Sequence, residues 1–222
     1  MDPGYGGQLL QGAGVTLEVA FTTLFFGLAF GLLGAAAKLS KAAWLRVPVM
    51  TVTSLLRGVP EFVILLICYF ELGNILQGLT GGRVSIDPFT GGVVALSIVL
   101  AAYSSETFRG AFLSVPPGQL EAARAFGMQP QQVFFRIHLP QAMRFALPSL
   151  SNLWQNLLKD SALVSVLGLE ELMQKASIAA QVTKQPFVYF LAAAFIYLIF
   201  LAISNVVFAR LERRAARGVA AS

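Results

Sequence analysis

The apolar residues of this chain fall into five long segments that short polar stretches separate. Each segment approaches or exceeds the roughly 20 residues that a helix needs to cross the hydrocarbon core of a bilayer. The pattern predicts an all-α, polytopic membrane protein with five transmembrane helices, at about 14–37, 47–72, 88–108, 143–166 and 187–209. No internal repeat or low-complexity linker divides the sequence, so we expect one transmembrane domain over residues 1–222.

Charged residues interrupt two of these five segments. The stretch from Arg57 to Glu61 divides the second segment, and Lys159 with Asp160 divides the fourth. Interrupted apolar segments indicate a transport pathway, because irregular or charged backbone inside a membrane must face protein or water. Arg57 and Lys159 could instead extend toward the inner interface and mark the ends of spans. The Asp160 side chain is too short to do the same, which favours a role in transport for this residue.

The composition excludes an ordinary soluble domain. The chain is 56% hydrophobic and only 12% charged, with a mean hydropathy of +0.71. Its net charge of +5 is unevenly placed, because basic residues follow the first span, lie in and around the segment at about 114–141 and recur in the C-terminal tail. Such clusters mark the cytoplasmic side of a membrane protein. We therefore expect a periplasmic N-terminus, a cytoplasmic C-terminus ending in Arg210, Arg213, Arg214 and Arg217, and no nucleic-acid partner.

A patterned segment lies between the third and fourth spans, at about 114–141. Gly127 suits the left-handed position after a helix, and Pro130 suits the first turn of another helix. The segment predicts two short cytoplasmic helices at an angle, the second of which ends at Pro140. Its fixed positions are Glu121, Ala122, Ala123, Gly127, Ile137, Leu139 and Pro140.

These fixed positions match the EAA signature of bacterial ABC importer permeases, and further segments extend the resemblance. Arg57-Gly-Val-Pro-Glu61, Tyr103-x2-Glu106-Thr-Phe-Arg109-Gly-Ala-Phe112 and Leu163-Val-Ser165-x2-Gly168-Leu-Glu170 resemble polar amino acid ABC permeases. Nearly the whole chain is similar to the Q-type permease subunits of histidine/lysine/arginine/ornithine importers. The resemblance implies a type I ABC importer fold in a bacterial inner membrane.

The same resemblance implies the partners of the chain. It implies two cytoplasmic ABC ATPase subunits, a second permease subunit of the paralogous M-type, and a periplasmic amino-acid-binding protein. The EAA positions would then seat on an ATPase and couple ATP hydrolysis to alternating access. The expected cargo is a basic L-amino acid: arginine, lysine, histidine or ornithine.

The residues themselves favour transport over catalysis. The sequence has no G-x-x-x-x-G-K-[ST] loop to hold nucleotide phosphates, so ATP hydrolysis belongs on another chain. Its one histidine, His138, and one cysteine, Cys68, make neither a metal site nor a nucleophile–base pair. We expect no enzymatic activity, no cofactor and no bound metal.

A cationic cargo needs carboxylates along its path, because charge in a low-dielectric environment is costly unless paired. Asp160 is the first candidate and Glu61 the second. Glu106 is set aside, because it has the helical spacing for an ion pair with Arg109. Asn152, Gln155 and Asn156 could offer uncharged contacts in span four or bond to neighbouring helices. Three alternatives remain: the same role with glutamine, glutamate or cystine as cargo, a secondary amino acid transporter, and a membrane scaffold or interaction protein that moves no solute.

Overall fold

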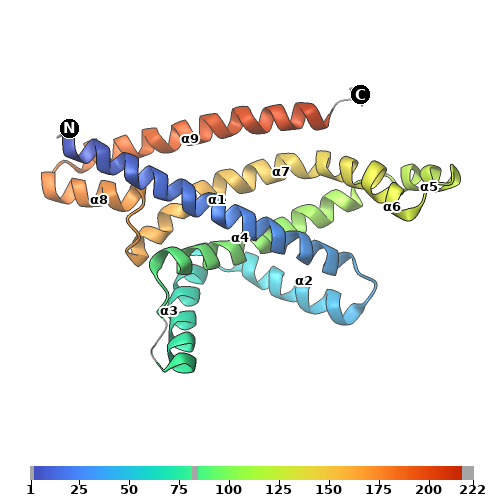
Figure 1. Cartoon of the computed structure of the whole chain (residues 1–222), viewed down its shortest axis with the longest axis horizontal. Coiled ribbons are helices and arrows are strands. Elements are labelled where there is room, and N and C mark those ends of the chain that lie inside the picture. The colour runs from blue at the N-terminus through green and yellow to red at the C-terminus, as the bar shows by residue number, and fades with distance from the viewer. Residues whose placement is uncertain (1–2, 82–84, 217–222) are drawn as a thin grey trace.

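The computed structural model describes residues 3–81 and 85–216, and every regular element within those residues is helical. Arg217 of the basic tail and residues 82–84 of an expected outer loop lie outside the described residues. The helices form an elongated bundle, with the N-terminal end of the chain at one extremity and the C-terminal end toward the other (Figure 1). The sequence prediction of an all-helical protein is confirmed.

Three long helices contain the uninterrupted apolar runs. They are α1 (Pro3–Leu39), α4 (Pro88–Leu113) and α9 (Pro186–Ala215). Asp87 begins α4, where its carboxylate accepts hydrogen bonds from the Thr90 amide at 3.0 Å and the Thr90 hydroxyl at 2.7 Å. These hydrogen bonds, the one from the Thr90 backbone above all, hold the pKa of the Asp87 carboxyl below its usual range.

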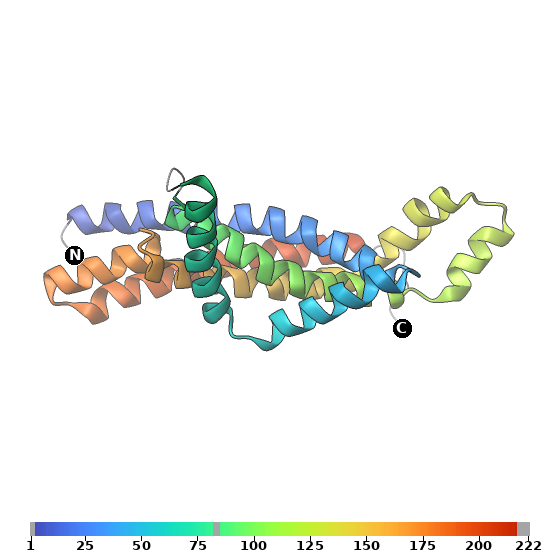
Figure 2. The ribbon, with the colours of Figure 1, turned by 90° about the horizontal axis from the view of Figure 1, so that it is seen from below.

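The second expected span is divided where the sequence places its interruption. Helix α2 (Ala43–Gly58) ends before Val59 and Pro60, whose extended backbone separates it from α3 (Glu61–Thr80). Pro60 has no amide hydrogen and disfavours a helical residue before it, so a continuous helix is broken at this point. In both views α3 stands across the long axis of the bundle (Figures 1 and 2).

Four helices among the described residues are long and apolar enough to cross a membrane: Gly4–Leu39, Glu61–Leu79, Pro88–Leu113 and Pro186–Ala215. The fourth span expected from the sequence, at about 143–166, is not one of them. Its residues form α7 (Leu139–Asp160) and a 3-10 turn, η2 (Ser161–Leu167). Polar side chains such as Asn152 and Asn156 lie along one exposed side of α7, so its apolar character is confined to the opposite face. The expected count of five spans is therefore not confirmed.

The helix at the N-terminal extremity, α8 (Leu172–Thr183), packs against both α1 and α9. Glu171 begins it and is fully buried. Its carboxylate accepts hydrogen bonds from the Gln174 amide, the Thr16 hydroxyl and the Tyr197 hydroxyl, at 2.8 to 3.1 Å. Because buried carboxylates are costly without partners, these bonds explain how α1, α8 and α9 are joined at one buried acid.

Helix α4 occupies the centre of the bundle and packs against α1, α2, α3 and α7. Glycines on α1 allow the closest of these approaches. A methyl group added at Gly31 would lie 1.9 Å from Ser104 Oγ, and one added at Gly27 would lie 2.6 Å from Leu100. The Gly27-x3-Gly31 spacing is therefore a close helix contact within the chain.

Candidate functional site

The EAA loop, residues 114–141, extends beyond one end of the bundle as two helical arms (Figure 2). Its first arm is α5 (Pro117–Ala125). Glu121 and Ala122 are exposed on this arm, whereas Ala123 is buried. Phe126 is 90% exposed at the tip of the loop. An apolar ring displayed in this way, beside a helix of small residues, suits docking to another protein.

Gly127 adopts the backbone conformation that its position in the motif predicts. Its φ is +75°, in the left-handed region that only glycine visits without steric cost. The Gly127 amide donates to the Arg124 carbonyl at 2.9 Å, and the Met128 amide donates to the Ala123 carbonyl at 3.2 Å. This pair of bonds is the Schellman arrangement that ends a helix and turns the chain sharply.

The second arm begins as predicted but does not end as predicted. Pro130 opens α6 (Pro130–Gln132), which continues through a π-helical segment, Val133–His138, into α7. We expected Pro140 to terminate this arm, and that prediction was wrong. Pro140 lies in the first turn of α7, where a residue without an amide hydrogen is tolerated. The second arm and α7 therefore form one uninterrupted helical segment, with Ile137 and Leu139 half-buried along it.

A polar cavity of about 470 Å³ lies where the end of α2 meets α4 and α7. Arg57, Tyr103 and Glu106 supply its charged and phenolic groups, and Ser114 and Ser149 add hydroxyls. The Tyr103 hydroxyl lies 3.2 Å from Glu61 Oε1 and 3.4 Å from the Arg57 carbonyl oxygen. With one hydrogen to donate, this hydroxyl bonds to one of these acceptors at a time.

Of the two carboxylates favoured by the sequence, Glu61 contacts the Tyr103 hydroxyl, and Asp160 lies close enough to both for the charges to interact. Each affects the other electrostatically, and both affect the Tyr103 phenol. Among the described residues, the Asp160 carboxylate forms no hydrogen bond or ion pair, and no ion pair joins Glu61 to Arg57. We call Glu61, Tyr103 and Asp160 the carboxylate cluster; its two negative charges repel each other and together favour a cation.

Glu106 is already occupied by cations of the chain itself. The Lys38 ammonium lies 3.2 Å from Glu106 Oε2 and 2.8 Å from Ser105 Oγ. Arg109 pairs with the other carboxylate oxygen of Glu106, as the spacing of three residues predicts. A carboxylate held between two cations has little remaining attraction for a third, so Glu106 has a structural role.

The polar residues of α7 have different surroundings. Gln155 donates to Asn205 Oδ1 of α9 at 3.0 Å, which is the helix-to-helix role left open by the sequence. Asn152 and Asn156 are exposed, one turn apart on the same face of α7. Their amides are therefore free to face a partner or a water-filled path.

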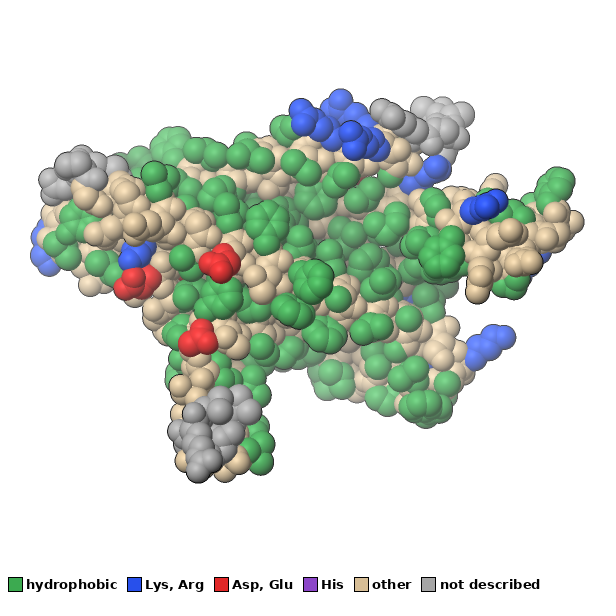
Figure 3. All heavy atoms as spheres, in the orientation of Figure 1, with side chains coloured by type: hydrophobic (Ala, Val, Ile, Leu, Met, Phe, Trp, Pro, Cys, Tyr) green, Lys and Arg blue, Asp and Glu red, His purple; other side chains and the backbone are tan. Residues whose placement is uncertain are grey.

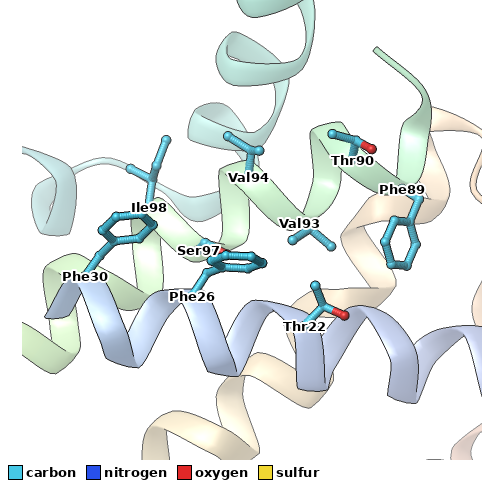
Figure 4. Close-up of a pocket in the computed structure, with 9 residues that line it drawn as sticks. All are labelled: Thr22, Phe26, Phe30, Phe89, Thr90, Val93, Val94, Ser97 and Ile98. Atoms are coloured by element: carbon cyan, nitrogen blue, oxygen red, sulfur yellow. The ribbon is translucent and has the colours of Figure 1, made fainter. Parts of the chain in front are cut away.

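A second cavity, of about 460 Å³, lies between α1 and α4 (Figure 4). Phe26, Phe30 and Val93 line it, and its polar groups are the hydroxyls of Thr22, Thr90 and Ser97. It contains no charged side chain to compensate an ammonium or carboxylate group. This apolar cavity is therefore a poor candidate for a charged cargo.

The sequence alone did not identify two residues of this region. Tyr103 lies in a motif that indicates no role for it, and Lys38 is one of several basic residues that follow the first span. The burial of the Lys38 side chain, which is 1% exposed in its ion pair with α4, could not be inferred from the local pattern, since its partner is 68 residues away.

The visible basic side chains lie largely toward the end of the molecule that carries the EAA loop and the C-terminus of α9 (Figure 3).

Comparison with known proteins identifies related chains over almost the whole length. Residues 27–217 match the family described as binding-protein-dependent transport system inner membrane components. The histidine/lysine/arginine/ornithine transport system permease protein HisQ of Escherichia coli is 42% identical over 97% of this chain and 96% of that protein. The nopaline transport system permease protein NocQ of Agrobacterium fabrum is 45% identical over 98% of this chain and 95% of that protein.

Solved structures have the same arrangement of helices. A chain in the crystal structure of an amino acid ABC transporter with histidines superposes with a TM-score of 0.82 at 33% identity, and the match covers 95% of each chain. The inward-facing methionine ABC transporter MetNI has a chain with a TM-score of 0.79 at 22% identity, covering 98% of this chain and all of that one. The latter likeness is one of fold.

Proposed function

The chain belongs to the family of binding-protein-dependent transport system inner membrane components, and from this premise we propose that it moves basic L-amino acids into the cell. It is a permease subunit of an amino acid ABC importer, a transport component of the inner membrane and not itself an enzyme. Arginine, lysine, histidine and ornithine are the proposed cargo. The observation that carries this choice is the pair of carboxylates, Glu61 and Asp160, which lie by one phenol and have no bonded cation among the residues that the structure describes.

The cargo follows from the charges along the polar surfaces. A guanidinium or ammonium group that passes Glu61 and Asp160 gains an attraction to two negative charges and relieves their mutual repulsion. Arg57 lines the neighbouring polar cavity and can attract the α-carboxylate of the same molecule. Asn152, Asn156 and Gln155 extend polar contacts along α7. This arrangement favours a zwitterion with a cationic side chain over glutamine, glutamate or cystine.

The EAA loop supports a partnership with two ABC ATPase subunits. Its exposed tip and the face that carries Glu121 and Ala122 would seat on one ATPase, and its continuity with α7 would pass a displacement into the bundle. A second permease subunit, of the M-type, would complete the pathway, and a periplasmic amino-acid-binding protein would deliver the cargo. The N-terminus would be periplasmic, and the EAA loop and C-terminus cytoplasmic.

Transport would proceed by alternating access. ATP binding would draw the two ATPases together, move the EAA loops and open the cavity toward the loaded binding protein. ATP hydrolysis would return the cavity to the cytoplasmic side. Each step requires the ATPases to bind one arrangement of the loops more tightly than the other, because a ligand shifts an equilibrium only through its differential affinity.

The proposal is tested by uptake of labelled arginine into proteoliposomes that contain the whole transporter and its binding protein. Unlabelled histidine, lysine and ornithine should compete with arginine, whereas glutamine and glutamate should not. We expect Asp160→Asn to lower arginine uptake roughly tenfold, the effect of about 1.4 kcal/mol of lost attraction. Uptake of glutamine or glutamate, with no competition by the cationic set, would refute the proposed cargo.

Glu71→Gln is the matched control for Asp160→Asn. It makes the same change of a carboxylate to an amide at an exposed position of α3. Because Glu71 makes no ion pair with any described residue, this variant should transport like the wild type. Arginine uptake that is equal in the two variants would retain the importer but remove Asp160 from the pathway.

A further inference from the structure

His138, the last residue of the π-helical segment, contacts the end of α4. Its Nε2 atom lies 3.1 Å from the backbone oxygen of Phe112. The imidazole also packs edge-on against the Phe112 ring, with centroids 5.1 Å apart, and Phe134 stacks on the same ring at 6.1 Å. The half-buried histidine is thus held both by a polar contact and by two aromatic rings.

The polar contact satisfies a carbonyl group that the helix cannot satisfy. In a continuing α-helix, the Phe112 carbonyl would accept from the amide four residues later, but that residue is Pro116, which has no amide hydrogen. A carbonyl can only accept, so the proton of the contact must be on Nε2 of His138. An unmet carbonyl at this position would cost free energy comparable to a lost hydrogen bond.

The contact also closes the base of the EAA loop. The loop leaves the bundle after α4 and re-enters it through the π-helical segment and α7. His138 therefore joins the exit of the loop to its return, across 26 residues of sequence. On one side α4 carries Tyr103, and on the other α7 ends at Asp160. A displacement of the loop reaches α7 through the continuous helix, and the His138 contact adds a direct polar connection to the end of α4, beside the packing of α4 against α7.

We propose that His138 is a positioning residue that holds the inner ends of α4 and α7 together, so that a displacement of the EAA loop moves both helices as one unit. This inference rests on the proposed function, because it assigns to that contact the coupling of ATP hydrolysis to cargo movement. It assigns no contact between His138 and the cargo.

The test uses two substitutions at one position in the assembled transporter. His138→Gln keeps an N–H donor of similar reach, and His138→Phe keeps an aromatic ring without a donor. Spin labels at Leu113 and Phe135, which are 61% and 63% exposed, report the distance between the end of α4 and the π-helical segment. Cys68→Ser removes the native thiol from the labelled protein. In parallel, the number of arginine molecules transported per ATP hydrolysed is measured.

We expect the wild type and His138→Gln to give one narrow distance distribution and the same transport per ATP. His138→Phe should broaden the distribution and lower the transport per ATP about fivefold, the effect of one net hydrogen bond. ATP hydrolysis itself should continue, which a variant that merely unfolds would not show. A narrow distribution and normal transport per ATP in His138→Phe would overturn the inference.

The two readouts separate this inference from the proposed function. If the wild type transports no amino acid but His138→Phe still broadens the distance distribution, the proposed function fails and the connection between α4 and α7 stands. If arginine uptake is normal and neither readout distinguishes the variants, the proposed function stands and the role of His138 in connecting α4 to α7 fails. Should His138→Phe fail to fold, His138→Leu removes the N–H donor without adding a second ring beside Phe112, and it should lower transport per ATP in the same direction.

Discussion

Lys38 is a charged residue in a place where charge is costly, since its side chain is 1% exposed within the apolar contact of α1 with α4. Glu106 and Ser105 satisfy two of its three donors, at 3.2 and 2.8 Å. A buried charge of this kind is retained only when such partners are present. The ion pair therefore specifies how the C-terminal end of α1 is placed against α4, whether or not it adds net stability.

Replacing Lys38 should destabilise the protein more than replacing an exposed lysine. Lys38→Met keeps most of the side-chain volume but removes the ammonium, which leaves Glu106 with Arg109 alone. We expect a loss of roughly 1–3 kcal/mol, the range for a hydrogen-bonded charged group, seen as a lower midpoint of thermal unfolding in detergent. Lys41→Met, at an exposed position three residues later, should leave the midpoint unchanged. Equal midpoints for the two variants would contradict a structural role for Lys38.

At the scale of single residues, sequence predicts what depends on local spacing. The Glu106–Arg109 ion pair follows from a spacing of three residues in a helix. The left-handed conformation of Gly127 follows from its position after a helix. The structure confirms both predictions. Lys38 and Tyr103 take their meaning from partners tens of residues away. Local patterns contain no information about such contacts, so their roles could not be predicted.

At the scale of elements, the contact of α1 with α4 depends on residues that lack side chains. Gly27, Gly31 and Gly34 follow one face of α1 and lie against Leu100, Ser104 and Ser105 of α4. The Ser104 hydroxyl lies 3.2 Å from the Gly27 carbonyl and can donate to it across this contact. Small residues allow two membrane helices to pack at such short range.

Alanine at two glycines of α1 should therefore have opposite effects on stability. Gly31→Ala places a methyl group 1.9 Å from Ser104 Oγ, and such overpacking costs typically 1–3 kcal/mol. Gly14→Ala fills open space on an exposed side of the same helix and should stabilise it by up to about 1 kcal/mol. Chemical or thermal unfolding in detergent distinguishes the two. A stabilising Gly31→Ala would show that the two helices are not in contact as described.

Sequence patterns predicted the breaks between elements better than their ends. The division at Pro60 and the change of helix type after Asp160 both occur where charge interrupts an apolar run. The prediction that Pro140 ends the second arm was wrong. Proline breaks a helix where its amide hydrogen would have bonded to a carbonyl of the preceding turn, and Pro140 lies in the first turn of α7. Where a π-helical segment passes into an α-helix the bonding pattern changes, and the chain continues through Pro140.

At the scale of the whole molecule, the EAA loop is the part of the chain that reaches farthest from the bundle on its side (Figure 2). We expect a partner to cover this surface. We also expect a partner or lipid to cover α3, because its apolar side chains are largely exposed. Family membership indicates what kind of assembly the chain enters. Which subunit covers which face depends on partners that are encoded elsewhere, so no pattern in this sequence could predict it.

A substitution at Gly127 tests whether the turn of the EAA loop is needed for binding an ATPase subunit. Gly127→Ala forces a Cβ atom into a left-handed conformation that costs roughly 1–2 kcal/mol, and it should distort the turn of the EAA loop. We expect capture of the ATPase subunit by the tagged permease to fall several-fold. Gly118→Ala adds the same methyl group within α5, where open space surrounds it, and should capture the ATPase normally. Equal capture by both variants would place the ATPase contact elsewhere.

The π-helical segment between the EAA loop and α7 gives the chain one residue more than α-helical spacing requires. Removal of one residue from Val133–His138 could be absorbed by a return to ordinary α-helical bonding, with little rotation of the loop. Removal of one residue from the middle of α7 could not be absorbed in this way. It would rotate the loop by about 100° relative to the far end of that helix. The length of this short segment, as much as the identity of its side chains, therefore sets the direction in which the loop faces.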